Sequence, residues 1–279
     1  MFDIIEKIGH TTIQHGKNND RIYLMKLDKK DYPVIIKKLK SIANKNGYTK
    51  ILAKIPKWAV DEFKKEGYIQ EGRILKFYNG KTDAYFLSNF REKNRAELDP
   101  NIKKQIDKNI KLAQSKKKPY LNIEFKPGLK LKLLGEENIN DLAGLYRQIF
   151  ETYPFPIFKP DFLKKTMNHH VVYFGIYDKR QLIAAASSEM DVESQNAEMT
   201  DFATLPDYRG HNLSLNLLRE MEAEMRQRKI KTLYTIARSH SPGMNITFAK
   251  LNYSFSGTLV NNTDIFGKIE SMNIWYKNL

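Results

Sequence analysis

The alternation of apolar and polar residues in the C-terminal half of the chain predicts a mixture of strands and helices. Apolar residues at every second position are typical of a half-buried strand, and apolar residues three or four positions apart are typical of an amphipathic helix. Strands are predicted at 129–134, 171–178, 181–190, 198–205 and 232–238, and helices at 137–151, 161–168, 212–228 and 243–251. This order of elements indicates an α+β fold with an antiparallel run of strands and one short parallel unit.

The N-terminal half contains a block that resembles one near the C-terminus. Residues 63–68 (FKKEGY) and 248–253 (FAKLNY) share Phe, Lys and Tyr at the same spacing, and Gly72 and Gly257 follow at the same distance. Each block comes after a β-branched strand and a helix start, and an aliphatic segment follows each one. A diverged internal repeat explains this match, so we expect residues 1–90 to form a smaller α+β domain that is a partial copy of the C-terminal one.

A basic segment, residues 91–128, connects the two halves. Isoleucines recur in it at helical spacing from Ile102 to Ile110. It lacks the interleaved aromatic residues of a surface that stacks on bases. We therefore interpret it as a charged connecting helix and divide the chain into an N-terminal domain (1–90), a basic helical linker (91–128) and a C-terminal domain (129–279).

Composition narrows the classes of function. The 279-residue chain contains no cysteine, which excludes disulfides, Cys-based zinc sites and a Cys nucleophile. The spacing of the six histidines does not match a metal site. No apolar run approaches the roughly 20 residues of a membrane span, and the N-terminal residues lack the pattern of a signal peptide. A cytoplasmic protein is therefore expected.

The charge is strongly positive, with 47 Lys and Arg against 32 Asp and Glu, a net charge of +15. An anionic partner such as nucleic acid or a polyphosphate cofactor is one interpretation. A Lys-rich solvated surface without such a partner is the other, and composition alone leaves both open.

Residues 200–218 (TDFATLPDYRGHNLSLNLL) combine the end of a predicted strand, a turn and the start of a predicted helix. The first turn of a helix carries unpaired N–H groups and a partial positive charge, so it can bind a phosphate if the backbone can come close. Gly210 allows that approach, Asn212 tolerates the left-handed conformation, and Ser214 is small. Arg209 adds a guanidinium for phosphate oxygens. From spacing alone, an ordinary Pro-Asp turn that caps the helix explains the segment equally well.

The stretch LPDYRGHNLS in this order of elements resembles the GCN5-related N-acetyltransferase (GNAT) superfamily, whose acetyl-CoA motif is Arg/Gln-x-x-Gly-x-Gly/Ala at the start of a central helix. The motif falls on residues 209–214, where Asn212 and Ser214 replace its small residues. The resemblance covers about residues 129–279. It implies a mixed, mostly antiparallel twisted sheet flanked by helices, with acetyl-CoA as the co-substrate and no metal.

The resemblance also implies which residues bind acetyl-CoA and stabilise the developing oxyanion, the latter through backbone N–H groups around Ala203. The expected cofactor-binding residues are Phe202, Ala203, Thr204, Arg209, Gly210, His211, Asn212, Leu213, Ser214 and Asn245. In this superfamily a Tyr in the last helix often protonates the departing thiolate. The aligned residue here is Phe248, which has no hydroxyl, so that role is left to water or to Tyr253.

Longer stretches are similar to the β-lysine N-acetyltransferases in particular: IQHGKNNDRIYLMKL, NGYTKILAKIP, ETYPFPIF and GTLVNNTDIFGKIESMNIWYK. This similarity spans nearly the whole chain, including the N-terminal domain. It implies acetylation of the N6 amine of β-lysine to give the compatible solute N6-acetyl-β-lysine. It also implies a pathway link to a lysine 2,3-aminomutase that makes β-lysine, with no nucleic acid and no membrane as partner.

The chemistry of such a reaction points to a base on the strand before the turn. An amine with a pKa near that of Lys, ~10.4, must lose a proton before it attacks a thioester, and a desolvated carboxylate can accept that proton. Glu198 and Asp201 lie on this strand. Because they are three residues apart, they face opposite sides of a regular strand, and only a bulge would let both face the substrate. The superfamily pattern favours Glu198, with Asp201 as the alternative.

A substrate with two amines and a carboxylate needs acidic and amide partners. Candidates in the C-terminal segment are Asn261, Asn262 and Glu270, and Tyr153 in the YPFP turn is a fourth. Other functions stay open at this point: acetylation of a polyamine or of L-lysine, and a non-catalytic protein that binds CoA or RNA.

Overall fold

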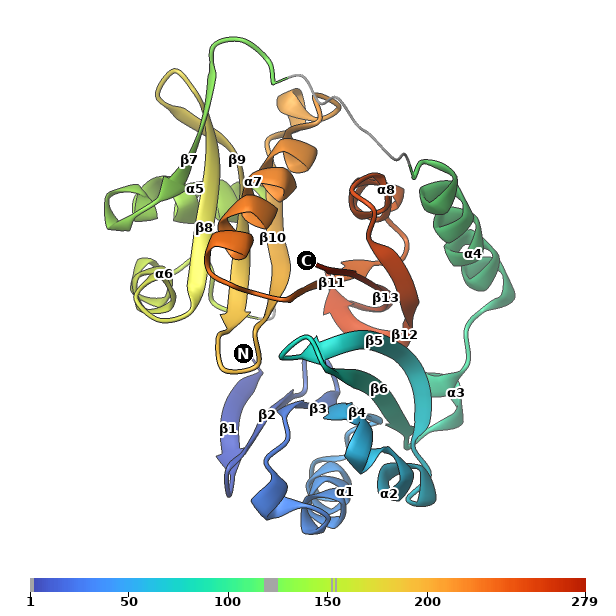
Figure 1. Ribbon diagram of the computed structural model, residues 1–279. Helices are drawn as coiled ribbons and strands as arrows, with labels where there is room; N and C mark the ends of the chain where they lie inside the picture. Colours follow the sequence, from blue (N-terminus) through green and yellow to red (C-terminus); the bar gives the residue numbers. More distant parts are fainter. Residues whose placement is uncertain (1–2, 118–124, 152, 154) are drawn as a thin grey trace.

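The structure, a computed structural model, describes residues 3–117, 125–151, 153 and 155–279. Its two β-sheets belong to the two halves of the chain, and the N-terminal unit lies below the C-terminal unit in Figure 1. Residues 1–2 and 118–124, assigned above to the N-terminal domain and to the linker, lie outside the described residues. The expected α+β class is confirmed.

The C-terminal sheet, as described, has seven strands in the order β12-β13-β11-β10-β9-β8-β7, and every neighbouring pair except β10 with β11 is antiparallel. Each strand predicted in this half is confirmed, with ends that differ by a few residues, and a C-terminal hairpin adds β12 and β13. The strands are β7 (Leu129–Leu134), β8 (Val171–Asp178), β9 (Gln181–Asp191), β10 (Asn196–Thr204), β11 (Thr232–Arg238), β12 (Ser254–Ile265) and β13 (Lys268–Asn278).

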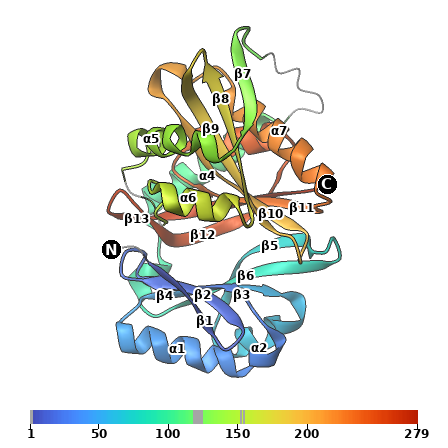
Figure 2. The same ribbon diagram turned by 90° about the vertical axis from the view of Figure 1, so that its left-hand side faces the viewer.

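Four predicted helices of this half are also confirmed: α5 (Ile139–Ile149), α6 (Pro160–Met167), α7 (Leu213–Gln227) and α8 (Pro242–Lys250). Helices α5 and α6 lie on one face of the sheet and α7 on the other (Figure 2). Helix α7 buries an apolar stripe that includes Leu217, Leu218 and Met221, because residues three or four apart share one face of a helix. This stripe packs on strands β8, β9 and β10.

Strands β10 and β11 separate after a short parallel contact. Their pairing runs only from Asn196 with Thr232 to Glu198 with Tyr234, although both strands continue. Helix α7 connects them, as a parallel pair requires a crossover. Beyond Glu198 and Tyr234 the two strands therefore diverge and leave an opening in the sheet.

The N-terminal sheet, as described, has six strands in the order β1-β2-β3-β4-β6-β5. They are β1 (Ile4–Ile8), β2 (Thr11–Gly16), β3 (Arg21–Lys26), β4 (Lys50–Pro56), β5 (Ile69–Tyr78) and β6 (Thr82–Phe90). Apolar residues on one face of this sheet, among them Ile13, Ile22 and Ile51, form a core with helices α1 (Val34–Asn46) and α2 (Val60–Lys65). The opposite face of the sheet is turned toward the C-terminal unit (Figure 2).

The two sheets share an arrangement that agrees with the internal repeat. Each contains a parallel pair, β3 with β4 and β10 with β11, and in each the second strand of that pair lies next to an antiparallel hairpin. The repeated blocks also form the same aromatic contact. The rings of Phe63 and Tyr68 are edge-on at 5.0 Å, as are those of Phe248 and Tyr253. We therefore propose that the two units are diverged copies, with the domain boundaries given above.

The described part of the linker contains helices α3 (Lys93–Ala96) and α4 (Pro100–Ser115), so the helix expected there is present. Helix α4 packs on α8 (Figure 1). Its Asn109 side chain donates hydrogen bonds to the carbonyls of Ser239 (3.0 Å) and His240 (3.1 Å), just before α8. The segment is therefore attached to the C-terminal unit.

Three buried cations, two on the N-terminal unit and one on α3 of the linker, bind consecutive carbonyls of β12. Lys50 donates to Val260, Arg95 to Asn261 and Arg21 to Asn262, each at 2.7 Å. These carbonyls lie where the register of β12 with β13 shifts between Leu259 and Thr263, which leaves them outside the regular ladder. The N-terminal unit and the linker thus both hold the irregular part of β12 in place.

A close backbone contact between β5 and β12 adds to this interface. A Cβ on Gly257 would lie 1.9 Å from the carbonyl oxygen of Glu71 and 2.9 Å from the Cα of Gly72. The two glycines of the repeated blocks therefore meet each other, and glycine at position 257 is required for the strands to approach.

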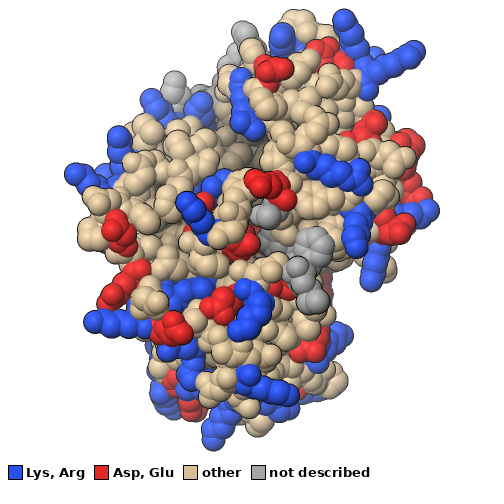
Figure 3. All heavy atoms as spheres, turned by 180° about the vertical axis from the view of Figure 1, so that it is seen from behind, with Lys and Arg blue, Asp and Glu red and all other residues tan. Residues whose placement is uncertain are grey.

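The positive charge is not gathered in one place on the face shown in Figure 3. Lys and Arg side chains there are interspersed with Asp and Glu side chains. This distribution favours the solvated Lys-rich surface over a nucleic-acid-binding patch on that face.

Candidate active site

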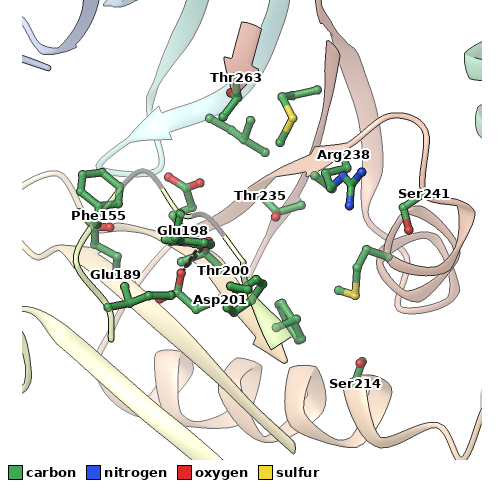
Figure 4. Close-up of a pocket in the computed structure, with 18 of the residues that line it drawn as sticks. Phe155, Glu189, Glu198, Thr200, Asp201, Ser214, Thr235, Arg238, Ser241 and Thr263 are labelled. Atoms are coloured by element: carbon green, nitrogen blue, oxygen red, sulfur yellow. Dashed lines mark hydrogen bonds between the residues drawn. The ribbon is translucent and has the colours of Figure 1, made fainter. Parts of the chain in front are cut away.

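A cavity of about 1160 Å³ lies where β10 and β11 diverge. It is lined by β10, β11, the N-terminal end of α7 and α8, and on its far side by strands β2, β3 and β4 of the N-terminal unit. Figure 4 shows Glu198, Thr200 and Asp201 along β10, with Thr235 and Arg238 of β11 across from them. The sheet opening and the N-terminal unit together enclose this space.

A β-bulge brings both candidate bases to the cavity. The register of β10 with β9 shifts between Thr200 and Ala203, and Asp201 has a φ of +55°. A left-handed residue inside a strand changes the side to which the following residues point. As a result, Glu198 and Asp201 both line the cavity despite the odd spacing between them. The spacing in the sequence required a bulge for both carboxylates to face the substrate, and the structure contains one.

The surroundings of Glu198 raise its pKa from an ordinary 4.5 to about 7. Burial is the main cause, because a charged carboxylate loses its hydration there, and the nearby Glu189 adds to the effect. The Lys54 ammonium and a hydrogen bond with Tyr234 oppose it. A carboxylate that titrates near neutral pH is suited to accept a proton from an amine.

Asp201 is held by hydrogen bonds at both of its oxygens. Tyr153 donates to Oδ1 and Ser187 donates to Oδ2. Burial raises the pKa of Asp201, and these two hydrogen bonds oppose the rise. Both carboxylate oxygens of Asp201 therefore already accept hydrogen bonds from the protein.

The turn before α7 has the backbone shape expected of an anion site. Gly210 has a φ of +84°, with no atom within 4 Å of the position that a Cβ would take, and Asn212 has a φ of +57°. The left-handed conformation expected at Asn212 is thus confirmed. Gly210, Asn212 and Ser214 line the cavity, so the N–H groups at the start of α7 face a space that a phosphate can enter.

These features fit acetyl-CoA, the co-substrate that the sequence resemblance implies. Arg209 and the first residues of α7 line the cavity, and the divergence of β10 and β11 leaves backbone groups beyond Glu198 and Tyr234 outside the β10–β11 ladder. Phe202 and Thr204 also line this channel, whereas Ala203 is buried against β9.

Other residues predicted from the sequence lie elsewhere. The side chain of His211 is exposed. Asn245 is fully buried, where its amide donates to the carbonyls of Arg238 and Ser241. Neither residue is among those that line the cavity within the described part of the chain.

The substrate candidates divide in the same way. Tyr153 and Asn262 line the cavity. Asn261 instead donates its side-chain amide to the carbonyls of Arg95 (3.1 Å) and Glu97 (2.9 Å). Glu270 forms a bidentate ion pair with Arg238, at 3.0 and 2.8 Å. Both side chains are thus committed to structural partners, and neither is among the described residues that line the cavity.

Phe248 lines the cavity at the position where the superfamily often has a tyrosine. Its ring packs edge-on against Phe202, at 5.7 Å, and against Tyr253. Tyr253 itself is 1% exposed and is not one of the described cavity residues.

Sequence reasoning missed the wall that the N-terminal unit contributes. Gln14, Arg21, Tyr23 and Lys54 all line the cavity. Arg21, Tyr23 and Lys54 occupy alternate positions of β3 and β4, opposite the apolar core face. Polar and aromatic residues at every second strand position were the available signal, but nothing in the sequence shows what that face meets.

Two further observations concern the described residues only. No group of three or more His, Asp or Glu side chains is arranged to hold a metal ion. No helix is long and apolar enough to cross a membrane.

Three features define an acetyl-CoA-dependent N-acetyltransferase of the GNAT type. They are the sheet that opens between β10 and β11, the left-handed turn before α7, and the carboxylates of Glu198 and Asp201 where the strands diverge.

The family model described as acetyltransferase (GNAT) family matches residues 136–253. The chain is 42% identical to a β-lysine N(6)-acetyltransferase of Methanococcus maripaludis, over 99% of each chain. It is 32% identical to a β-lysine N(6)-acetyltransferase of Methanosarcina mazei, over 86% of this chain and 95% of that protein. It is also 31% identical to the N-acetyltransferase YodP of Bacillus subtilis, over the full length of both. The chain belongs to the GNAT acetyltransferase family and, within it, to the family of these full-length relatives.

Proposed function

We propose that this protein transfers the acetyl group of acetyl-CoA to the N6 amine of β-lysine. The observation that carries the proposal is the pair of carboxylates, Glu198 and Asp201, that line the cavity where β10 and β11 diverge. The identity of 42% to a β-lysine N(6)-acetyltransferase over nearly the whole chain supports this choice of acceptor.

Glu198 is the proposed base. In water the N6 amine is protonated, since its pKa is near ~10.4, and it must lose that proton before it can attack. Above a pH of about 7 Glu198 is ionised and can accept the proton, directly or through water. Asp201, which Tyr153 and Ser187 hold in place, is proposed to orient the amine through hydrogen bonding and charge.

The coenzyme supplies an activated acetyl thioester when it is bound. We propose that Arg209, Gly210 and the first N–H groups of α7 hold its pyrophosphate. The backbone of Phe202 and Thr204, in and just after the bulge, is proposed to lie beside the thioester and to donate to its oxygen.

The cellular setting follows from the same proposal. β-Lysine would come from a lysine 2,3-aminomutase, and N6-acetyl-β-lysine would serve as a compatible solute. We propose that the reaction takes place in the cytoplasm and involves no nucleic acid. The mixed charges on the face in Figure 3 support the latter point.

A substrate panel tests the acceptor. The purified protein is mixed with acetyl-CoA and, in turn, β-lysine, L-lysine, spermidine or a lysine peptide, and release of free thiol is followed. Product mass and fragmentation then show which nitrogen carries the acetyl group. We expect the highest kcat/KM with β-lysine and acetylation at N6. Thiol release at the background rate with β-lysine would refute the proposal.

A further inference from the structure

The N-terminal wall of the cavity contains buried hydrogen-bond donors without an acceptor. The Nε2 of Gln14, the Nε of Arg21 and the hydroxyl of Tyr23 have no hydrogen-bond partner among the described residues. All three side chains are less than one-tenth exposed, and all three residues line the cavity. Because an unpaired buried donor is costly, a ligand with free lone pairs is the expected partner.

The three donors are neighbours on one face of the N-terminal sheet. Gln14 lies directly opposite Tyr23 in the β2–β3 ladder, so their side chains project from the same face. Arg21 is two residues before Tyr23 on β3 and shares that face, and its guanidinium carbon lies 5.5 Å from the Tyr23 ring centre. The three unpaired donors thus form one cluster and are not at unrelated places in the protein.

Arg21 makes this cluster positively charged. Burial lowers the pKa of Arg21 only to about 10, so the guanidinium stays charged at neutral pH. Its Nη1 donates to the Asn262 carbonyl at 2.7 Å and to the Thr263 hydroxyl at 3.3 Å, and both of these acceptors are uncharged. The carboxylates of Asp3 and Glu198 act on Arg21 through charge and raise its pKa, but the Nε has no hydrogen-bond partner among the described residues, so this edge favours a bound anion.

The cavity is therefore polarised. Lys54 adds a second cation to the N-terminal wall, where its Nζ donates to the Tyr234 hydroxyl at 3.2 Å. Glu198 and Asp201 line the cavity from β10 of the C-terminal unit, and Glu198 is close enough to Lys54 for the ammonium to lower its pKa. Near the donors, the Oδ1 of Asn262 is a buried acceptor that has no hydrogen-bond donor among the described residues. The carboxylates of β10 thus suit an amine, and the unpaired groups around Arg21 suit a carboxylate beside an ammonium group.

We propose that this N-terminal wall is the subsite for the amino-acid end of the acceptor. Arg21, Gln14 and Tyr23 bind the carboxylate, and Asn262 accepts a hydrogen bond from the C3 ammonium. The N6 amine at the other end of the chain then lies at Glu198. This inference rests on the proposed acceptor, and it gives the N-terminal unit a role in selecting amino acids over polyamines.

The test compares β-lysine with 1,4-diaminopentane, which has the same two amines at the same separation but no carboxylate. The quantity measured is the ratio of kcat/KM for the two acceptors. For the wild-type protein we expect the ratio to favour β-lysine by roughly 10- to 100-fold, the worth of a charge-assisted hydrogen bond. Arg21→Gln should bring the ratio close to one, mainly through KM for β-lysine.

Two pairs of variants separate recognition from folding. Arg95→Gln is the control for Arg21→Gln, because Arg95 is equally buried and holds the neighbouring Asn261 carbonyl, but it is not among the described cavity residues. Tyr23→Phe removes only the unpaired hydroxyl and should lower the ratio several-fold. Its control is Tyr68→Phe, which removes another buried, unpaired hydroxyl away from the cavity.

Each outcome is decisive. A lower ratio in Arg21→Gln and Tyr23→Phe, with wild-type ratios in both controls, supports the subsite. Equal losses on both acceptors in Arg21→Gln and an unchanged ratio in Tyr23→Phe would show a purely structural role and overturn the inference. A wild-type protein that acetylates both compounds equally well overturns the inference and leaves the proposed function intact. Turnover of the diamine without any turnover of β-lysine refutes both.

Discussion

Glu198 and Asp201 face the same cavity although they are three residues apart on β10, because Asp201 adopts a left-handed backbone with a φ of +55°. A non-glycine residue in this conformation inside a strand is strained, and strain of this kind is typical of functional sites. The hydrogen bonds from Tyr153 and Ser187 to Asp201 keep it there. Glu198, as the proposed base, and Asp201, which is proposed to orient the amine, should therefore respond differently to substitution.

Glu198→Gln should lower kcat roughly 100-fold or more, since the amine loses its proton acceptor. In the wild-type protein kcat/KM should rise with pH through about 7, as Glu198 ionises among Glu189, Asp201, Lys54 and Tyr234. The variant should lack this limb of the profile, which steady-state kinetics from pH 5.5 to 9 measures. Glu193→Gln, on an exposed carboxylate at the end of β9, should keep both the rate and the limb. If kcat/KM of Glu198→Gln still rises with pH through about 7, another group is the base.

The same substitution should stabilise the protein at high pH. The folded state holds the Glu198 proton more tightly than the unfolded chain does, so stability falls as the pH rises from 4.5 to about 7 and then stays lower. Glutamine at position 198 does not ionise, so the variant does not lose this stability as the pH rises. We expect Glu198→Gln to be more stable than wild type by about 2–3 kcal/mol at pH 8 and nearly equal to it at pH 4.5. Urea unfolding at both pH values measures this, and equal stabilities at pH 8 would contradict it.

Asp201→Ala should destabilise the protein by roughly 1–3 kcal/mol. Alanine leaves the Tyr153 and Ser187 hydroxyls without their acceptor and tolerates the left-handed conformation less well than Asp. Asp201→Asn keeps an acceptor and should lose less stability. Because Asp201 is not the proposed base, Asp201→Asn should retain the rise of kcat/KM near pH 7. If Asp201→Asn lacks the rise of kcat/KM near pH 7, Asp201 is the base instead of Glu198.

Gly210→Glu should raise the Kd for acetyl-CoA by at least about tenfold. A side chain at a φ of +84° strains the turn, and its negative charge lies where the phosphates are proposed to bind. Gly128→Glu is a matched control, because Gly128 also has a positive φ (+88°) and open space around it but does not line the cavity. Isothermal titration calorimetry measures both, and unchanged affinity in Gly210→Glu would remove this turn from the coenzyme site.

The buried Lys50–Glu71 ion pair, at 2.9 Å, should be required for joining the two units. Lys50 donates to the Val260 carbonyl and Glu71 accepts from the Val260 N–H. Glu71→Gln should cost about 3 kcal/mol, since Lys50 loses the carboxylate partner that opposes the effect of burial on its pKa, which is already lowered to about 8. The double variant Lys50→Met/Glu71→Leu should recover part of this loss. Thermal melts test this, and a double variant less stable than Glu71→Gln would show that the charges themselves stabilise the interface.

Several features could be predicted from the sequence because they depend on local chemistry. The strand and helix periods placed β7 to β11 and α5 to α8 within a few residues of their observed bounds, but they did not predict the hairpin of β12 and β13. The tolerance of asparagine for positive φ anticipated the conformation of Asn212. The repeated FKKEGY and FAKLNY blocks anticipated two sheets of related topology.

Residue chemistry was a weaker guide to the acceptor site. Asn261 and Glu270 have suitable side chains, but the fold commits Asn261 to the carbonyls of Arg95 and Glu97, and Glu270 to Arg238. Whether a polar group is free for a ligand depends on which partners the tertiary structure supplies.

The sequence by itself determined the succession of elements, the turn before α7 and the two acidic residues of β10, since periodicity, backbone preference and residue type are local properties. Only the tertiary structure decided that a bulge turns both acidic residues toward one cavity. It also decided that Arg21 and Tyr23, distant in the chain, form the opposite wall. A strand's alternation shows that it has two faces, but only the packing of the two sheets determines what the second face meets.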